Sequence, residues 1–470
     1  MALRLKRVLP VAIAVGCVAA ALVSSPASSS PAKPLSVTWM SGFAAPGTPA
    51  KYDKVGVIKI GPSSAKNVLV LEPGTSAGSA YFVPLAEWIV SKESGWQVWS
   101  VERRENLLED QSELNLFKEG KATATQLYDY YLGYLKDPSI TDHFQLIPSS
   151  TVEFGKQWGM NVAVEDLHGV IEAAKKLGGK VVLGGHSLGG SVVTAYATWD
   201  FNGRAGADDL AGLVYIDGGS SPSALSAQQA NFELQSLDAP SASPWLAFGG
   251  IAAPYAGVFN ATGSAAALLD PNAPNLAQPS GLLPSDLVPP VRVTNVGQYG
   301  YALNVATSPM GLLAAQGHLG VGLAARGPVH GWDGRGALTP INRFATMFSG
   351  LGVNDADGTE WYFPQRLTDD TGAVDNGNAN PAQSVLDLDA TMGHDLPRNL
   401  RIYAFGARLG GAGVLQDARI LAQQSQIPLS NLTLVNRQST YAHNDPAGAY
   451  PNNVFFDHLV PFLMKVSSHG

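Results

Sequence analysis

The residues best suited to chemistry in this sequence are the pentapeptide GHSLG at positions 185–189, which has the spacing G-x-S-x-G. The apolar run 181–184 precedes it, and residues 191–198 continue it with the composition of a helix. A serine on such a strand-to-helix turn has an exposed hydroxyl, and the flanking glycines let strand and helix approach closely. We therefore predict that Ser187 is a nucleophile, with the helix start favouring the negative charge that develops beside it.

A serine hydroxyl needs a neighbouring base to attack at neutral pH. His443, within STYAHNDP, follows the apolar run 431–436 and precedes the last helical pattern of the chain. We predict that His443 is this base. His458, inside that last helical pattern, is the alternative. We expect His186, next to the serine, to shape the turn.

An acid should orient the histidine and stabilise its charged form. Asp217 directly follows a buried strand pattern, and the chain order of serine, aspartate and histidine suits it. Asp417, inside a helical pattern, is the alternative acid. We interpret Asp445, which precedes Pro446, as a turn former.

An oxyanion hole requires two backbone donors. We expect one at Leu188, the residue after the nucleophile, and the other at Thr75 or Ser76 in the turn EPGTSAG. The alternative is that this turn is only a glycine-rich bend and has no catalytic role.

Strand and helix patterns alternate around these residues, which is typical of a parallel sheet with crossover helices. The strands are expected at 55–60, 68–71, 96–101, 181–184, 210–219, 400–406 and 431–436. The helices are expected at 79–94, 162–179, 191–198, 414–427 and 454–466.

The regular alternation is interrupted twice. Residues 104–160 predict a first excursion from the core, and periodicity is lost across 220–395. Because a structureless loop of that length is improbable in a compact domain, we expect 220–395 to form a mainly helical cap. The core then consists of 51–219 and 396–470, preceded by a linker over 28–50 that is rich in Ser, Pro, Ala and Gly.

The first residues have the charged, apolar and small-residue order of an export signal. We predict a signal peptide over 1–27 and a protein that is secreted or retained at the cell envelope; an uncleaved anchor is the alternative. Cys17 is the only cysteine. Without residues 1–27 the chain has none, which excludes disulfides and thiolate chemistry.

The composition limits the ligands. With 30 basic and 38 acidic residues and no basic patch, the chain does not suit nucleic acid. We expect no metal, no cofactor and no membrane span after signal removal. The acidic stretches 354–360 and 369–380 are interpreted as solvated turns rather than calcium loops.

The GHSLGG elbow, the PGTSAG turn and the late HNDP histidine resemble the α/β-hydrolase superfamily in its lipase and carboxylesterase branch. The resemblance covers about 55–220 and 396–466. It implies an α/β-hydrolase fold: a mostly parallel central sheet flanked by helices, with the cap inserted before the last two core strands. The missing acid after the strand 400–406 departs from the commonest pattern of this superfamily.

The resemblance implies hydrolysis of a small-molecule or lipid ester through an acyl-enzyme. The alternatives are an acyltransferase with the same site and a non-enzymatic surface binding protein on the same fold.

Overall fold

The structure of the chain is a computed structural model, which describes residues 34–220, 224–248, 251–324 and 327–468. The expected signal peptide, 1–27, lies outside the described residues.

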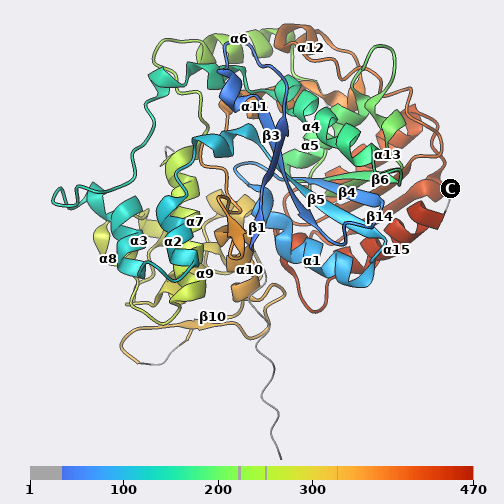
Figure 1. Cartoon of the computed structure of the whole chain (residues 1–470). Coiled ribbons are helices and arrows are strands. Elements are labelled where there is room, and N and C mark those ends of the chain that lie inside the picture. Colours follow the sequence, from blue (N-terminus) through green and yellow to red (C-terminus); the bar gives the residue numbers. More distant parts are fainter. Residues whose placement is uncertain (1–33, 221–223, 249–250, 325–326, 469–470) are drawn as a thin grey trace, which may run out of the picture. The chain divides into compact units, whose positions relative to one another are not determined.

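A sheet of eight strands forms the centre of the structure (Figure 1). Its order is β14-β13-β7-β6-β4-β5-β3-β2. The six strands from β14 to β5 pair in parallel, whereas β3 and β2 add antiparallel pairs at one edge. The strands are β2 (Thr38–Ser41), β3 (Lys54–Ile60), β4 (Asn67–Glu72), β5 (Trp96–Glu102), β6 (Val181–His186), β7 (Gly212–Ile216), β13 (Arg401–Gly406) and β14 (Leu432–Asn436).

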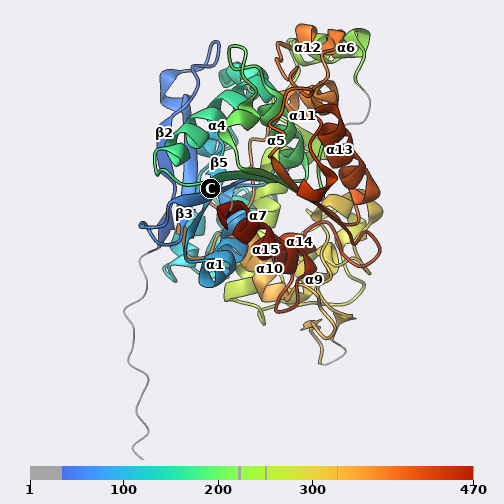
Figure 2. The ribbon, with the colours of Figure 1, turned by 90° about the vertical axis from the view of Figure 1, so that its right-hand side faces the viewer.

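The central strands are apolar on both faces, because helices cover both (Figure 2). On β4, Val68 and Val70 pack in one buried cluster, whereas Leu69 and Leu71 pack in the other. The first cluster includes α4 (Met160–Lys175), α5 (Leu188–Thr198) and α13 (Gly411–Gln424). The second includes α1 (Val83–Lys92) and α15 (Val454–Ser468). The predicted fold class is therefore confirmed.

The linker predicted over 28–50 is wrong for part of its length. Residues 38–41 form β2, which pairs antiparallel with β3 at the edge of the sheet. Residues 35–36 form β1, which pairs with β12 (Val353–Asn354). The sequence pattern does not indicate this strand, because a short edge strand with one solvated face has no continuous apolar run.

In the described part of the long insertion between β7 and β13, the regular secondary structure is mainly helical and irregular segments connect the helices. Its helices are α6 (Ala227–Leu237), α7 (Ala253–Leu269), α8 (Ala277–Ser280), α9 (Asn295–Leu303), α10 (Ile341–Ser349), α11 (Gln365–Asp370) and α12 (Pro381–Leu386). Two small two-stranded sheets join them, β8–β9 (Ala247–Phe248, Ile251–Ala252) and β10–β11 (Gly322–Leu323, Trp332–Asp333). Among the described residues, no helix combines the length and apolarity needed to cross a bilayer.

The first excursion lies in the same layer as the part of the long insertion that contains α7. Its helices α2 (Ser112–Lys118) and α3 (Ala124–Tyr131) pack against α7 (Figure 1). Two insertions far apart in the sequence therefore build one cover over the end of the sheet. The sequence patterns indicated both, but not that they meet.

Candidate active site

Ser187 stands on a strained turn between β6 and α5. Its backbone angles are φ 56° and ψ −127°, a region that L-residues rarely adopt. A Cβ at residue 185 would lie 2.2 Å from the carbonyl oxygen of Gly189, so strand and helix can approach only with glycine there. The amide of Ser187 donates to the carbonyl of Ile216 at 3.0 Å, which ties the turn to β7. The predicted local structure around Ser187 is therefore present.

Asp217 directly follows β7 and is buried, with φ 48°. Four backbone N–H groups donate to its carboxylate: those of Ala407 at 2.6 Å, Leu409 at 3.1 Å, Gly410 at 3.0 Å and Gly411 at 3.2 Å. These donors belong to the turn between β13 and α13. The turn has no acid of its own, but it holds the acid of the neighbouring strand by its backbone. Four such bonds fix the position and orientation of the Asp217 carboxyl group.

His443 lies on the loop after β14, between that strand and α15, and is buried. Its Nδ1 lies 2.7 Å from Oδ2 of Asp217, although 226 residues separate them. An Nδ1–H that donates to a carboxylate leaves Nε2 with a lone pair, which is the tautomer a general base requires. The two side chains thus form the contact that the predicted roles need.

Ser187 and His443 both line one cavity of about 470 Å³. Within the described part of the chain, no hydrogen bond joins the Ser187 hydroxyl to either ring nitrogen of His443. Such bonds are often loose without substrate and tighten in the reacting complex.

The cavity walls are mostly apolar and come from both insertions. α3 contributes Leu127 and Tyr128, and α7 contributes Phe259 and Ala266. Further parts of the wall come from α8, α9 and two short 3-10 helices, Ser285–Leu287 and Met310–Ala315. A cavity of this size and character suits an apolar ligand of drug-like dimensions.

His186 links the turn at Ser187 to the loop that carries His443. Its Nε2 lies 3.0 Å from the carbonyl oxygen of His443, and its ring stacks on Tyr81. Burial lowers the pKa of His186 well below its ordinary value, and the neighbouring His443 lowers it further. A neutral His186 that donates to the His443 carbonyl agrees with its predicted role in shaping the turn.

The turn 73–77 lies against the nucleophile. A Cβ at residue 74 would be 2.8 Å from the Cβ of Ser187. Thr75 and Ser76 line the cavity, and the Ser76 hydroxyl donates to the Glu360 carbonyl at 2.7 Å. In the described part of the chain, the backbone N–H groups of Thr75 and Leu188 have no acceptor. Both are therefore available as donors, as an oxyanion hole requires.

The alternative residues lie elsewhere. Nδ1 of His458 is 2.9 Å from the carbonyl of Val454 in its own helix, and His458 does not line the cavity. Asp417 lies on α13, and burial raises its pKa to about 6. Asp417 makes no contact with His443 among the described residues.

Asp445 does more than form a turn, which corrects our interpretation. It is buried and accepts hydrogen bonds from the Ala442 amide at 2.6 Å and the Thr339 hydroxyl at 2.7 Å. Its Oδ2 also lies 2.5 Å from Nδ1 of His318. His318 and Thr339 belong to the long insertion, so Asp445 ties that insertion to the loop that carries His443. No local pattern in the sequence pointed to these distant partners.

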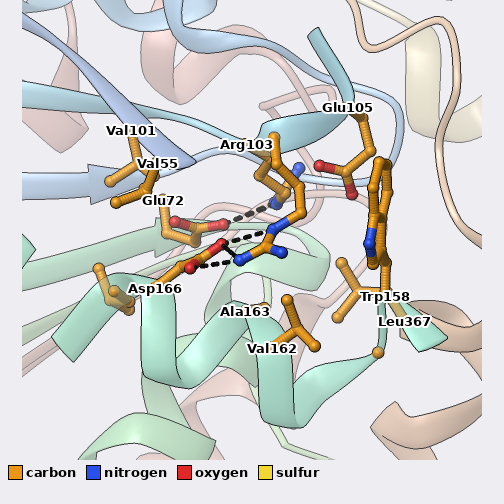
Figure 3. A pocket seen from close by; sticks show the side chains of 13 residues that line it. Val55, Glu72, Val101, Arg103, Glu105, Trp158, Val162, Ala163, Asp166 and Leu367 are labelled. Atoms are coloured by element: carbon orange, nitrogen blue, oxygen red, sulfur yellow. Dashed lines mark hydrogen bonds and ion pairs between the residues drawn. The ribbon is translucent and has the colours of Figure 1, made fainter. Parts of the chain in front are cut away.

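A second buried polar region surrounds a small cavity of about 20 Å³ between β3, β4, β5 and α4 (Figure 3). Arg103 donates through Nε to Oε1 of Glu72 at 2.8 Å, and Arg104 donates through Nε to Oδ2 of Asp166 at 2.9 Å. The charged run Glu-Arg-Arg-Glu at 102–105, directly after an apolar strand, is the signal that could have revealed this region.

The interpretation of 354–360 as a solvated turn is also wrong. Asp357 and Glu360 are fully buried, because the stretch packs against the second polar region. The Gln111 amide donates to Oδ2 of Asp357 at 2.7 Å.

Among the described residues, one group of three side chains has the spacing of metal ligands: His168, Glu172 and Asp209. Lys175 forms ion pairs with Glu172 and Asp209. Its ammonium group therefore already balances the charge of these two carboxylates.

A comparison with curated protein sequences gives no match. Among solved structures, a candidate lipase from Sulfolobus solfataricus is similar, with 15% identity, 91% of this chain and 93% of that chain covered, and a TM-score of 0.47. A thermophilic esterase from Thermogutta terrifontis has 12% identity, coverage of 92% and 99%, and a TM-score of 0.36.

A monoglyceride lipase from Saccharomyces cerevisiae, solved with a substrate analogue, has 10% identity, coverage of 92% and 95%, and a TM-score of 0.38. Residues 69–319, more than half of the chain, match the family model described as the alpha/beta hydrolase family. The eight-stranded, mostly parallel sheet and its flanking helices agree with that match. The chain belongs to the alpha/beta hydrolase family.

Proposed function

We propose that this protein hydrolyses carboxylic esters that carry a large apolar group, with Ser187 as nucleophile, His443 as general base and Asp217 as the acid that orients it. The observation that supports this most is the 2.7 Å contact between His443 and Asp217, at a cavity that Ser187 also lines. The three residues come from three separate loops at one end of the parallel strands. This is the end at which open α/β sheets bind their ligands.

In the acylation step, Nε2 of His443 takes the hydroxyl proton of Ser187 while Oγ bonds to the ester carbonyl carbon. The carbonyl oxygen becomes an oxyanion that accepts from the N–H groups of Leu188 and of Thr75 or Ser76. As the tetrahedral intermediate collapses, the carbon–oxygen bond to the alcohol breaks. The alcohol then leaves with the proton from His443.

In the deacylation step, His443 takes a proton from water, and the hydroxide attacks the acyl carbon. The bond to Oγ of Ser187 breaks, the acid leaves, and the serine regains its proton. Asp217 stabilises the imidazolium in both steps without itself becoming protonated.

The mostly apolar cavity supports an ester with a long or bulky hydrocarbon part. Burial in such a cavity stabilises each methylene by about 0.8 kcal/mol. A lipid ester or an apolar small-molecule ester fits this requirement.

The test is the turnover of a panel of esters by the wild type and by Ser187→Ala. We expect turnover by the wild type alone, because removal of such a nucleophile costs on the order of a millionfold in kcat. Equal turnover by both would refute the proposal. Product analysis with an added acceptor alcohol distinguishes hydrolysis from acyl transfer: hydrolysis predicts that the free acid remains the main product.

We further propose that the protein is exported, on the sequence order of residues 1–27 alone. Mass spectrometry of the protein recovered from the medium or envelope should find a chain that begins near residue 28. A chain in the cytoplasm that retains residues 1–27 would contradict export.

A further inference from the structure

We infer that Arg103 is a positioning residue for the oxyanion site: its buried guanidinium holds the carbonyl groups of the turn 73–77 so that the N–H of Thr75 is directed to the cavity. This inference rests on the proposed function. Arg103 does not touch the cavity that Ser187 lines, and it would act through the backbone of this turn.

The contacts of Arg103 are concentrated on that turn. Nη2 donates to the carbonyl of Pro73, and Nη1 lies 3.3 Å from the carbonyl oxygen of Gly74 and 3.4 Å from that of Ala77. The Nε group donates to Glu72, the last residue of β4, at 2.8 Å. One planar group therefore contacts the Glu72 side chain at the strand end and three carbonyl groups of the turn. Figure 3 shows the contact between Arg103 and Glu72.

Peptide geometry converts these contacts into an orientation. In a planar trans peptide the C=O and the N–H point in opposite directions. The carbonyl of Gly74 faces the guanidinium, so the N–H of Thr75 in the same peptide faces away from it. Thr75 lines the cavity, and Gly74 packs against the side chain of Ser187.

The charge of Arg103 acts in the same direction. A cation that binds a carbonyl polarises the peptide and strengthens the N–H at its other end. Burial alone lowers the pKa of Arg103, but the adjacent Glu72 carboxylate raises it, and the pKa lies above its ordinary value, so the charge is kept. Its side chain is 6% exposed, and water therefore screens this charge little.

The other side of the turn is fixed by Glu360. Its backbone N–H donates to the carbonyl of Ser76 at 3.0 Å, and its carbonyl accepts from the Ser76 hydroxyl. The turn is thus held between Arg103 and Glu360 in the conformation that leaves the Thr75 N–H free.

Arg104 provides a matched control in the same buried region. Its guanidinium binds Asp166, Asp53 at 3.1 Å and the carbonyl of Phe43 at 2.9 Å. Within the described chain it makes no contact with 73–77. Lysine at either position keeps the charge but cannot donate to several acceptors in a plane. The two substitutions should therefore disturb the fold similarly and the turn differently.

The experiment compares Arg103→Lys with Arg104→Lys in the full-length protein. We measure kcat and KM for an ester that the wild type turns over, the affinity of a boronic acid that forms a tetrahedral adduct with serine, and the melting temperature. Arg103→Lys should lower kcat on the order of a hundredfold, as expected when one oxyanion donor is lost, with KM changed by less than about threefold.

The boronic acid resembles the transition state, so its affinity should fall by a similar factor in Arg103→Lys. Arg104→Lys should lower the melting temperature comparably, yet keep kcat and boronic acid affinity within about threefold of the wild type. If Arg103→Lys does not fold, the pair Arg103→Gln and Arg104→Gln is compared in the same way.

Equal losses of kcat in the Arg103 and Arg104 variants would overturn the inference, because both residues would then act only on stability. The same holds if kcat falls in the Arg103 variant while boronic acid affinity does not. A wild type without ester turnover would overturn the proposed function together with this inference. An active wild type with unaffected Arg103 variants would overturn this inference alone.

Discussion

Two buried polar regions meet at the turn 73–77: the first contains Ser187, His443 and Asp217, and the second contains Arg103, Arg104 and the acids around them. They differ in whether every buried carboxyl group has a hydrogen-bond partner. In the first, Asp217 accepts four backbone N–H bonds and contacts His443, beside a cavity of about 470 Å³. In the second, neither oxygen of Glu360 has a hydrogen-bond partner among the described residues, and the adjoining cavity measures about 20 Å³. The first region is suited to hold charge beside a ligand.

The second region has more acids than cations near it. Burial raises the pKa of Glu102 to about 8 and that of Glu105 to about 7, and it raises the pKa of Glu360 well above the ordinary range. At neutral pH Glu102 is therefore mainly protonated and Glu105 about half protonated, whereas Arg103 keeps its charge. The comparison teaches that the first region presents Ser187 and His443 to the cavity, whereas in the second region Arg103 is buried behind the turn 73–77 and contacts its backbone.

The largest expected effect separates the first region from the rest of the protein. His443→Ala should reduce kcat about as much as Ser187→Ala, on the order of a millionfold, because serine and base act as one unit. The double variant should be no worse than either single variant. Steady-state kinetics on one ester checks this, and a double variant that loses far more than either single variant would contradict it.

The next effect tests the acid. Asp217→Asn should lower kcat on the order of ten-thousandfold, since it disturbs the tautomer and orientation of His443. Asp417→Asn is the matched control and should keep kcat within about threefold. A loss confined to the Asp417 variant would transfer the role of the acid to α13.

A smaller effect concerns the place where the two regions meet. In Gly74→Ala the new Cβ would lie 2.8 Å from the Cβ of Ser187, so the turn or the nucleophile must shift. We expect kcat to fall on the order of a hundredfold, the cost of a displaced oxyanion donor. Gly95→Ala, where a Cβ meets nothing within 4 Å, should leave kcat unchanged. Equal kinetics in both variants would argue against the turn as part of the site.

The acyl-chain preference of the cavity that Ser187 lines should change the rate by graded amounts. For nitrophenyl esters of increasing acyl length, kcat/KM should rise roughly two- to fourfold per methylene until the cavity is filled. Ala266→Trp, which fills part of the wall, should shift the optimum to shorter chains and leave the acetate ester unaffected. A preference for acetate in the wild type would contradict an apolar ligand.

The smallest effect concerns how the second polar region contributes to the stability of the fold. The folded protein holds protons on Glu102 and Glu105 that the unfolded chain releases above the ordinary carboxyl pKa of about 4.3. The folded state thus binds more protons between roughly pH 4.5 and 8, and the free energy of unfolding must fall as the pH rises through this window.

Glu102→Gln removes one of these protons from the balance. The decrease in melting temperature between pH 5 and pH 8.5 should therefore be smaller in Glu102→Gln than in the wild type. The exposed Glu87, changed to Gln, should leave the decrease unaltered. A wild type that becomes more stable as the pH rises from 5 to 8.5 would contradict the protonation of Glu102 and Glu105 in the folded state.

The same contrast explains how much the sequence could predict. The turn at Ser187 was predictable because strand, serine and helix are neighbours in the chain. The proximity of Asp217 and His443 was predictable because the ends of parallel strands meet at one edge of a sheet. The edge strand β2 was missed, since four residues with a solvated face leave no apolar run.

The long insertion could be predicted only as a helical cover. Its contacts depend on partners far away in the sequence, such as His318 with Asp445, and no local pattern encodes them. For the same reason, 354–360 was interpreted as solvated although Asp357 and Glu360 are buried. The part of α3 in the cavity wall was equally beyond local patterns.

The central claim is that Ser187 is an activated nucleophile, and covalent labelling tests it most directly. The native protein is treated with a fluorophosphonate probe, digested and mapped by mass spectrometry, beside heat-denatured protein and His443→Ala. We predict one adduct, on Ser187, which is lost on denaturation and strongly reduced without His443. No adduct on Ser187 in the native protein, or equal labelling after denaturation, would contradict the account.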